Sequence, residues 1–350
     1  MEPIKETLTF DDVLLLPRYS SVLPSETNLN IKLGHNLNLK SPFLSSAMDT
    51  VTESNMAIAI AQKGGIGIIH RNLSINDQVK EIKKVKNKKL IVGAAVGTAD
   101  EDLIRAKSIL NAGVDLIVID TAHGHSERVI KILSKIKKIV IKTPICVGNI
   151  ASGEAALKLY NEGADILKVG IGPGSICTTR IIAGIGVPQI SAVMEVKKSM
   201  KNKKIKIISD GGIKFSGDLI KGLAAGADAI MMGSIFAGTD ESPGKKFKYK
   251  NKFYKTYRGM GSIGAMSAGS SNRYFQKHQK DKSKFVPEGV EAKVAYKGSV
   301  DEILYQLQGG LRSSMGYIGA KTIEDIQKKA KFIKITKAGF YESMVHSVET

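Results

Sequence analysis

A short glycine-rich stretch carries the best candidate nucleophile of the chain. It runs from Gly170 to Arg180 as Gly-Ile-Gly-Pro-Gly-Ser-Ile-Cys-Thr-Thr-Arg. Three glycines in five positions let backbone N–H and C=O groups approach a ligand or a cation without interference from Cβ atoms. Ser175 can donate to a phosphate, and the Cys177 thiol becomes a nucleophile where local positive potential deprotonates it. The alternative, a small buried residue beside a glycine turn, fits the surrounding glycines and threonines less well.

The second cysteine and a pair of histidines are weaker candidates for catalysis or metal binding. Cys146 lies inside an apolar run, so we expect it to pack in the core. Two cysteines form no disulfide framework, and no C-x-x-C pair offers a zinc site. His123 and His125 could bind a metal, but two histidines without a third ligand make a weak site.

Two more glycine-rich stretches follow apolar runs, at Ser209-Asp-Gly-Gly212 and at Gly233-Ser234. Glycine amides at such positions often hold a phosphate. Asp210 could accept hydrogen bonds from the two hydroxyls of a ribose. Its alternative role is to cap the helix that follows.

The elements that position these residues are short apolar runs without strict alternation, as expected of strands covered on both sides. The eight predicted strands are Pro42–Met48, Gly65–His70, Leu90–Val96, Asp115–Asp120, Thr143–Gly148, Asp165–Gly170, Ile205–Asp210 and Asp228–Gly233. Helical spacing occurs between them and after them, in Asn76–Lys86, Asp100–Ala112, Gly153–Glu162 and Ile323–Ala330.

Three junctions share one pattern, Ala112-Gly-Val-Asp115, Glu162-Gly-Ala-Asp165 and Ala225-Gly-Ala-Asp228. Glycine suits the left-handed end of a helix, and the aspartate begins the next strand. Eight such units predict an α/β fold, a (β/α)8 TIM barrel with its active site at the carboxyl ends of the strands. A doubly wound open sheet is the alternative, disfavoured by the strand count and by the lack of a G-x-G-x-x-G loop.

Composition limits the remaining classes. No apolar run approaches the roughly 20 residues of a membrane span, and Met1–Glu6 lacks the layout of a secretory signal. We therefore expect a cytoplasmic protein. The net charge of +19 could attract phosphate-rich ligands. Its lysines occur in segments such as Lys80–Lys89, Lys131–Lys142 and Lys197–Lys206 rather than beside aromatic residues, so solvated helix faces explain them better than nucleic-acid binding.

Two segments interrupt the repeat. Residues 238–297 show little periodicity, and a loop of this length is usually either functional or disordered. We expect an active-site loop and flap there, inserted after strand eight. The tail, residues 322–350, should pack on a neighbouring chain or on the rim of the barrel.

These features resemble the IMP dehydrogenase / GMP reductase family over nearly the whole chain. The motifs that carry the resemblance are Leu8–Val13, Ser45–Glu53, Gly64–His70, Gly170–Arg180, Ser209–Gly212, Tyr257–Ser262, Ser271–Gln276, Pro287–Gly289 and Gly309–Ser313. The resemblance implies that Cys177 adds to C2 of inosine 5′-monophosphate (IMP) and that a hydride passes to NAD⁺. Arg273, with Tyr274, would then activate the water that releases xanthosine 5′-monophosphate.

The resemblance also implies further site residues. Thr179 and Glu288 would lie near the water, and Asp49 would orient the arginine. The nucleotide would bind to Asn149, Ser175, Asp210, Gly212, Gly233, Ser234, Tyr257, Gly259, Met260, Gly261 and Glu288. The cofactor would bind to Asp120, Ala122 and Gly170, and to Tyr317 of a neighbouring subunit. Potassium would bind to carbonyls of Gly172, Gly174 and Cys177, completed by Glu342, Ser343 and Met344 of an adjacent subunit of a homotetramer.

The chain departs from the family in one respect. Relatives normally carry a paired regulatory module, two cystathionine-β-synthase (CBS) repeats, between the second and third barrel strands. Here only a predicted helix separates these strands, and residues 85–90 mark the position where the module is absent. We therefore expect a single catalytic domain over residues 1–350, without regulation through that module.

Two rival functions remain. GMP reductase resembles this barrel, shares the cysteine loop and lacks the regulatory module. However, the Ser271–Gln276 motif belongs to the hydrolytic flap, which a reductase does not need. A nucleic-acid-binding barrel is the more remote alternative, suggested only by the charge.

Overall fold

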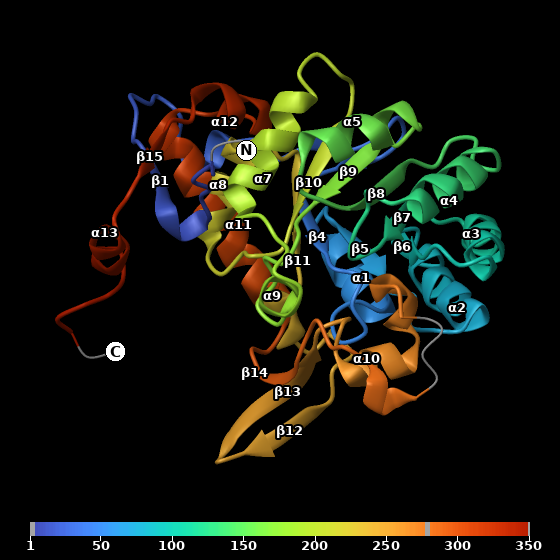
Figure 1. Ribbon diagram of the computed structural model, residues 1–350. Helices are drawn as coiled ribbons and strands as arrows, with labels where there is room; N and C mark the ends of the chain where they lie inside the picture. Colours follow the sequence, from blue (N-terminus) through green and yellow to red (C-terminus); the bar gives the residue numbers. More distant parts are fainter. Residues whose placement is uncertain (1–3, 277–280, 349–350) are drawn as a thin grey trace.

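The computed structural model describes residues 4–276 and 281–348. Eight parallel strands close into a barrel in the order β10-β11-β4-β5-β6-β7-β8-β9, which confirms the predicted (β/α)8 fold (Figure 1). Seven of the eight predicted runs contain one of these strands, and the run Thr143–Gly148 overlaps the remaining strand, which continues to Ile150. The barrel strands are β4 (Phe43–Ser45), β5 (Ile66–Ile69), β6 (Gly93–Val96), β7 (Leu116–Asp120), β8 (Ile145–Ile150), β9 (Ile166–Val169), β10 (Lys206–Asp210) and β11 (Ala229–Met232).

Helices cover the outside of the barrel, and the four predicted helices are among them. The helices are α1 (Ser54–Gln62), α2 (Ile75–Lys86), α3 (Glu101–Asn111), α4 (Glu127–Lys137), α5 (Gly153–Asn161), α6 (Thr179–Ile182), α7 (Gln189–Ser199), α8 (Ser216–Ala224), α9 (Ser234–Ala237), α10 (Ile263–Ala268), α11 (Val300–Ile318), α12 (Ile323–Lys329) and α13 (Lys337–Glu342). Residues 87–92 alone join α2 to β6, at the position where the family's module would lie. In the described parts of the chain, no helix is both long enough and apolar enough to cross a bilayer.

The barrel has an apolar core on each side of its wall. Inside, Ile68, Val118 and Ile208 belong to a buried cluster that also includes Cys146. Cys146 is fully buried in this cluster, which confirms that it is a packing residue, and burial raises the pKa of its thiol to about 12. Leu33 belongs to the same cluster and lies between β2 (Ile31–Lys32) and β3 (Asn38–Leu39) in the sequence. A second cluster fills the space between the strands and the helices.

The Gly-x-Asp junctions have a structural basis that the sequence only partly predicts. Gly113, Gly163 and Gly226 adopt φ of +86°, +92° and +119°, the left-handed region that a helix end requires. Each aspartate accepts a hydrogen bond from a backbone N–H within one residue of the start of the neighbouring strand. The three bonds, each 2.9 Å, are Val92 N to Asp115, Ile145 N to Asp165 and Ile207 N to Asp228. The repeat therefore links adjacent barrel strands as well as ending helices.

The segment 238–297 is more ordered than its sequence suggests. It contains a three-stranded antiparallel sheet of β12 (Lys246–Tyr249), β13 (Lys252–Arg258) and β14 (Glu291–Ala295). Helix α10 lies between β13 and β14 in the sequence. The β12–β13 hairpin projects away from the barrel in Figure 1. Lysine and aromatic residues alternate in Lys246–Tyr249 with the period of a strand, a signal that the apparent lack of periodicity over the whole segment hid.

The two ends of the chain meet in a small sheet. β1 (Val13–Leu15) pairs in antiparallel fashion with β15 (Phe332–Lys334). Beyond β15, α13 and the following residues extend away from the barrel (Figure 1). Tyr341 and Val345 are exposed there, so this part of the tail does not pack on the barrel rim of its own chain.

Candidate active site

A pocket opens at the carboxyl ends of the barrel strands and gathers most of the residues that the sequence singled out. Those that line it are Asp120, Ala122, Asn149, Gly170, Gly172, Gly174, Ser175, Cys177, Thr179, Asp210, Gly212, Gly233, Ser234, Tyr257, Gly259, Met260, Arg273, Tyr274 and Glu288. They come from five barrel strands and from the segment after strand eight, which explains why no local pattern reveals the whole set.

Cys177 lies in the loop between β9 and α6. Its thiol is free and partly exposed, and its Sγ lies 3.2 Å from Oγ1 of Thr179, the first residue of α6. The backbone N–H of Thr178 donates to the carbonyl of Glu288 at 3.0 Å. This backbone bond joins the cysteine loop to the segment that carries Arg273 and Tyr274, so the two parts of the site are held in register.

Gly172 has a backbone conformation that the loop requires. Its φ of +76° disfavours residues with a side chain, and a Cβ atom there would lie 2.7 Å from Cγ of Arg180. The Arg180 side chain donates to the carbonyl of Ile171 in this loop and to the carbonyl of Val187, between α6 and α7. Arg180 thus braces the glycine-rich stretch from within.

Lys168 is the main site residue that the sequence analysis missed. It is 2% exposed in strand β9, and its Nζ donates to Asp120 Oδ1 at 2.9 Å and to Asp210 Oδ2 at 2.8 Å. It also contacts Asn149 Oδ1, while the Asn149 amide donates to Asp210 at 2.9 Å. A lone lysine in an otherwise apolar strand was the available signal, because a buried ammonium requires partners of opposite charge.

Arg273 contacts the other oxygen of Asp120. Its guanidinium pairs with Asp120 Oδ2, and its carbonyl accepts a hydrogen bond from the Ala122 N–H at 3.3 Å. The Nε of Arg273 is buried without a hydrogen-bond partner among the described residues. Burial raises the pKa of the neighbouring Tyr274, an effect that the charge of Arg273 partly opposes.

Tyr257 lies where the loops after β9 and β11 meet. Burial raises its pKa to about 12, although a hydrogen bond with Ser175 acts in the opposite direction. A Cβ atom on Gly233 would lie 3.3 Å from the Tyr257 hydroxyl, so glycine lets this hydroxyl approach the end of β11. Hydroxyls of Tyr257, Ser175 and Ser234 therefore surround one corner of the pocket.

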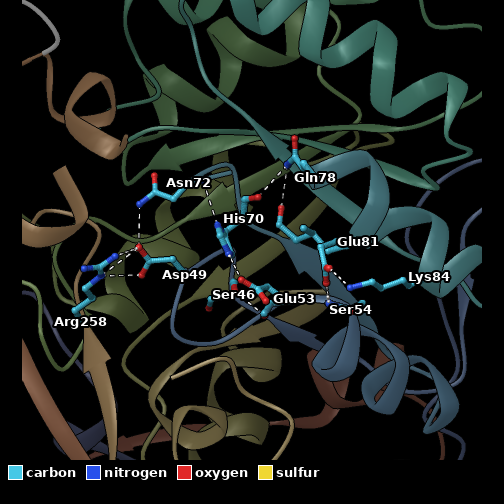
Figure 2. Close-up of polar contacts among 12 residues, drawn as sticks. Ser46, Asp49, Glu53, Ser54, His70, Asn72, Gln78, Glu81, Lys84 and Arg258 are labelled. Carbon is cyan, nitrogen blue, oxygen red and sulfur yellow. Dashed lines mark hydrogen bonds and ion pairs between the residues drawn. The ribbon is translucent and has the colours of Figure 1, made fainter. Parts of the chain in front are cut away.

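Asp49 does not contact Arg273, contrary to the expectation. It accepts hydrogen bonds from Arg258 Nη2 at 2.7 Å and from the Asn72 side-chain amide at 2.9 Å (Figure 2). The same Asn72 amide donates to the carbonyl of Ala265 in α10. Arg273 instead pairs with Asp120, whereas Asp49 joins Arg258 at the end of β13 to Asn72.

The buried His70 helps to position Asn72 for its contact with Asp49. The Asn72 backbone N–H donates to His70 Nδ1 at 3.1 Å, which leaves Nε2 to carry the proton and donate to Glu53 at 3.1 Å (Figure 2). Arg258, Asn72 and His70 received no individual role from the sequence, although Arg258 and His70 stand in the motifs quoted above and Asn72 follows one of them by two residues.

Several predicted residues lie outside the pocket. Gly261 lies just behind it, where a Cβ atom would lie 2.8 Å from Cζ of Tyr274. Tyr317 is exposed on α11, and Glu342, Ser343 and Met344 are on the extended tail, so none of these lines the pocket of its own chain. His123 and His125 touch ring to ring at 6.3 Å, and within residues 4–276 and 281–348 no three His, Cys, Asp or Glu side chains group as metal ligands.

Comparisons with known proteins converge on one family. The model of the IMP dehydrogenase / GMP reductase domain matches residues 7–346. A protein named inosine-5′-monophosphate dehydrogenase from Borreliella burgdorferi is 50% identical, with 98% of each chain covered. Proteins of that name from Cryptosporidium parvum and Aquifex aeolicus are 47% and 40% identical; both alignments cover 99% of this chain and 96% of the relative. The Aquifex alignment runs over 475 residues against the 350 of this chain, so that relative contains additional residues.

Proposed function

The chain belongs to the IMP dehydrogenase / GMP reductase family, and from this premise we propose that it oxidises IMP to xanthosine 5′-monophosphate with NAD⁺ and water. One observation carries the proposal. A free, partly exposed cysteine at the carboxyl end of a barrel shares its pocket with Thr179, Arg273 and Tyr274, the groups that the second, hydrolytic step needs. This reaction is the committed step of guanine nucleotide biosynthesis.

IMP would bind with its phosphate at the hydroxyl-lined corner. Ser175, Ser234 and Tyr257 would hold the phosphate together with amides at Gly212 and Gly233, as phosphates often bind after the last strands of such barrels. Asp210 would accept from the ribose hydroxyls. The remaining nucleotide contacts would come from Asn149, Gly259, Met260, Gly261 and Glu288.

NAD⁺ would lie on the side of Asp120, Ala122 and Gly170, with Tyr317 reaching in from a neighbouring subunit. When bound, it accepts the hydride that leaves C2 of IMP. The donor set fits such a ligand, since Asp120 and the Ala122 N–H offer an acceptor and a donor for ribose and amide groups. Arg273 contacts both Asp120 and the Ala122 N–H in this structure. We therefore propose that the flap and the dinucleotide alternately occupy the space beside Asp120 and Ala122.

The chain's own groups would act in two steps. The Cys177 thiolate adds to C2, and after hydride loss the purine remains bound to sulfur as a thioimidate. Water then adds to C2, its proton passes to Arg273 with Tyr274 and Thr179 beside it, and the C–S bond breaks to free the thiolate. Because a guanidinium has a pKa above about 12, Arg273 needs a proton relay or a site that stabilises its neutral form.

A monovalent cation would stabilise the cysteine loop. We propose that potassium binds carbonyls of Gly172, Gly174 and Cys177, with Glu342, Ser343 and Met344 supplied by an adjacent subunit. The glycines support this, because they leave carbonyls free to turn toward a cation. Activity that is the same in potassium and in a large organic cation would contradict this part of the proposal.

We further propose a cytoplasmic homotetramer with one catalytic domain per chain and no regulatory module. Exposed Ile181, Ile182 and Ile185, 84%, 50% and 61% accessible beside the cysteine loop, offer an apolar surface for a neighbour. A light-scattering mass tests the assembly.

Incubating the protein with IMP and NAD⁺ while following the absorbance of reduced cofactor tests the reaction. Steady production of reduced cofactor is expected. If instead only GMP and NADPH react, the chain is a GMP reductase and the assignment fails.

A further inference from the structure

Lys255 is a buried cation that the proposed reaction does not use. It lies in β13, is 4% exposed, and donates to three backbone carbonyls, those of Thr239 at 2.7 Å, Ser242 at 2.5 Å and Asp240 at 3.4 Å. Burial lowers the pKa of its ammonium, an effect that the negative charges of Asp240 and Glu241 partly oppose. Because hydrogen bonds must compensate the burial of a charge, these carbonyls fix the ammonium in one place.

The two acidic side chains of this region have other partners. Both carboxylate oxygens of Asp240 accept from the Tyr296 hydroxyl at 2.8 Å. Glu241 accepts from the Val300 N–H at 2.9 Å, at the start of α11. The hydrogen bonds of Lys255 therefore go to the backbone of residues 239–242, which we call the α9 turn.

The α9 turn is fixed to the carboxyl end of helix α9. The Thr239 hydroxyl donates to the carbonyl of Phe236 at 2.8 Å, and the Ser242 hydroxyl donates to the carbonyl of Ala237 at 2.8 Å. Phe236 and Ala237 are the last two residues of α9, which begins at Ser234. Lys255 is thus joined through the α9 turn to one end of this short helix.

Tyr257 lies on the same face of β13 as Lys255. Alternate side chains of a strand point to opposite faces, and Lys255 and Tyr257 are the two buried residues of β13. At the other end of α9, a Cβ atom on Gly233 would lie 3.3 Å from the Tyr257 hydroxyl. One strand therefore reaches both ends of α9, through Lys255 and the α9 turn at the carboxyl end and through Tyr257 at the amino end.

We propose that Lys255 is a positioning residue for the phosphate of IMP, because it fixes β13 along α9 and so holds the Tyr257 hydroxyl beside Ser234. This inference rests on the proposed function, in which both hydroxyls bind that phosphate. Tyr257 and Ser234 line the pocket, whereas Lys255 is not among the described residues that line it. Lys255 therefore acts on the phosphate through Tyr257, and not on the purine at Cys177.

A lysine that only supports the fold would behave differently. Its loss would change the free energy of unfolding, while the molecules that remain folded would bind IMP as before. Loss of a positioning residue changes the affinity of folded molecules for the phosphate group. Comparison of IMP with inosine separates the two roles, since inosine is the same ligand without its phosphate.

Lys255→Met keeps an unbranched side chain and removes the ammonium. It should raise the Kd for IMP in calorimetry about tenfold, the lower end of the effect of one hydrogen bond to a charged group. KM for IMP should rise by a similar factor, whereas kcat and KM for NAD⁺ should stay within about twofold of the native values, because the phosphate is held equally in the ground state and the transition state. Inosine, measured as a competitor of IMP, should bind to both proteins equally. Lys252→Met, at an exposed lysine of the same strand, is the matched control and should bind IMP like the native chain.

Tyr257→Phe shows whether Lys255 acts through the tyrosine hydroxyl. Alone, this variant should weaken IMP binding about tenfold. Combined with Lys255→Met it should cause little further loss, because the hydroxyl is already displaced. Independent effects would instead multiply to a loss of about a hundredfold in the double variant.

Ser242→Ala tests the same linkage if Lys255→Met does not fold. It removes the hydrogen bond between the α9 turn and Ala237 and leaves the three acceptors of Lys255 in place. The Kd for IMP should rise about threefold, as expected when one neutral hydrogen bond is lost, and inosine binding should again stay the same.

A native Kd for IMP in folded Lys255→Met, or in Ser242→Ala where only that variant folds, would overturn the proposal. Equal losses of IMP and inosine affinity, or multiplied losses in the double variant, would overturn it as well. If the native chain itself does not bind IMP, the result counts against the proposed function.

Discussion

At the mouth of the barrel one lysine side chain holds two carboxylates of different expected function. Lys168 donates to Asp210, on the proposed ribose side, and to Asp120, on the proposed cofactor side. In this structure Arg273 adds a second cation to Asp120. Two cations and two carboxylates therefore balance in the pocket, and removing either cation leaves a buried negative charge.

Replacing Lys168 with methionine should destabilise the protein by about 3–5 kcal/mol, the usual cost of removing one partner of a buried ion pair. It should also weaken IMP binding, because Asp120 and Asp210 would repel each other. Lys168→Arg keeps the charge and should recover part of both losses. Denaturant titration and calorimetry with IMP measure the two effects. A Lys168→Met variant as stable as the native chain would show that the network contributes no net stability.

Arg273 separates the two chemical steps. Arg273→Ala should leave the first hydride transfer intact and slow hydrolysis by about 10²–10⁴-fold, the usual contribution of a positioned acid or base. A rapid burst of reduced cofactor followed by slow turnover is the expected record in stopped flow. Equal slowing of the burst and of the steady state would contradict the role given to the flap.

At the scale of elements, the recurring aspartates bind neighbouring strands together. Asp165→Ala removes the acceptor of the Ile145 N–H and a partner of Lys137, which should lower the stability by about 1–3 kcal/mol. Asp100→Ala is a suitable control, because Asp100 is fully exposed and does not cap α3. Thermal unfolding of both variants is compared. Equal midpoint temperatures for Asp165→Ala and Asp100→Ala would show that the Gly-x-Asp repeat does not stabilise the fold.

A second set of contacts attaches the segment after strand eight to the barrel. Asp49 joins Arg258 at the end of β13 and, through Asn72, α10 (Figure 2). Asp49→Ala should loosen this attachment, so trypsin should cut between Arg258 and Glu288 faster than in the native protein. Asp301→Ala removes an exposed carboxylate elsewhere and should leave the rate unchanged. A native rate for Asp49→Ala would mean that other contacts hold the flap.

At this scale the sequence predicts regular elements well and irregular ones poorly. The strands and helices of the barrel follow from apolar runs, helical spacing and Gly-x-Asp junctions, because each depends on neighbours in sequence. The β12–β14 sheet was missed, although lysine and aromatic residues alternate in β12 with the period of a strand. Lys168, Arg258 and Asn72 were missed as site residues because their roles arise from partners distant in sequence.

At the scale of the whole molecule, two surfaces outside the pocket differ in character. The apolar loop beside Cys177 and the extended tail carrying Met344 are the regions that an assembly would cover. The basic hairpin lies on a separate projection (Figure 1). The resemblance to a family identified the pocket residues nearly completely, yet it indicated neither the hairpin nor the contact of Arg273 with Asp120.

The central claim is that Cys177 forms a covalent bond with the purine during turnover. Mass spectrometry of protein quenched in acid while it turns over IMP and NAD⁺ tests this claim most directly. We expect a nucleotide adduct on the peptide that contains Cys177, more abundant in Arg273→Ala and missing in Cys177→Ala. Rapid IMP oxidation without any adduct on that peptide would contradict the mechanism.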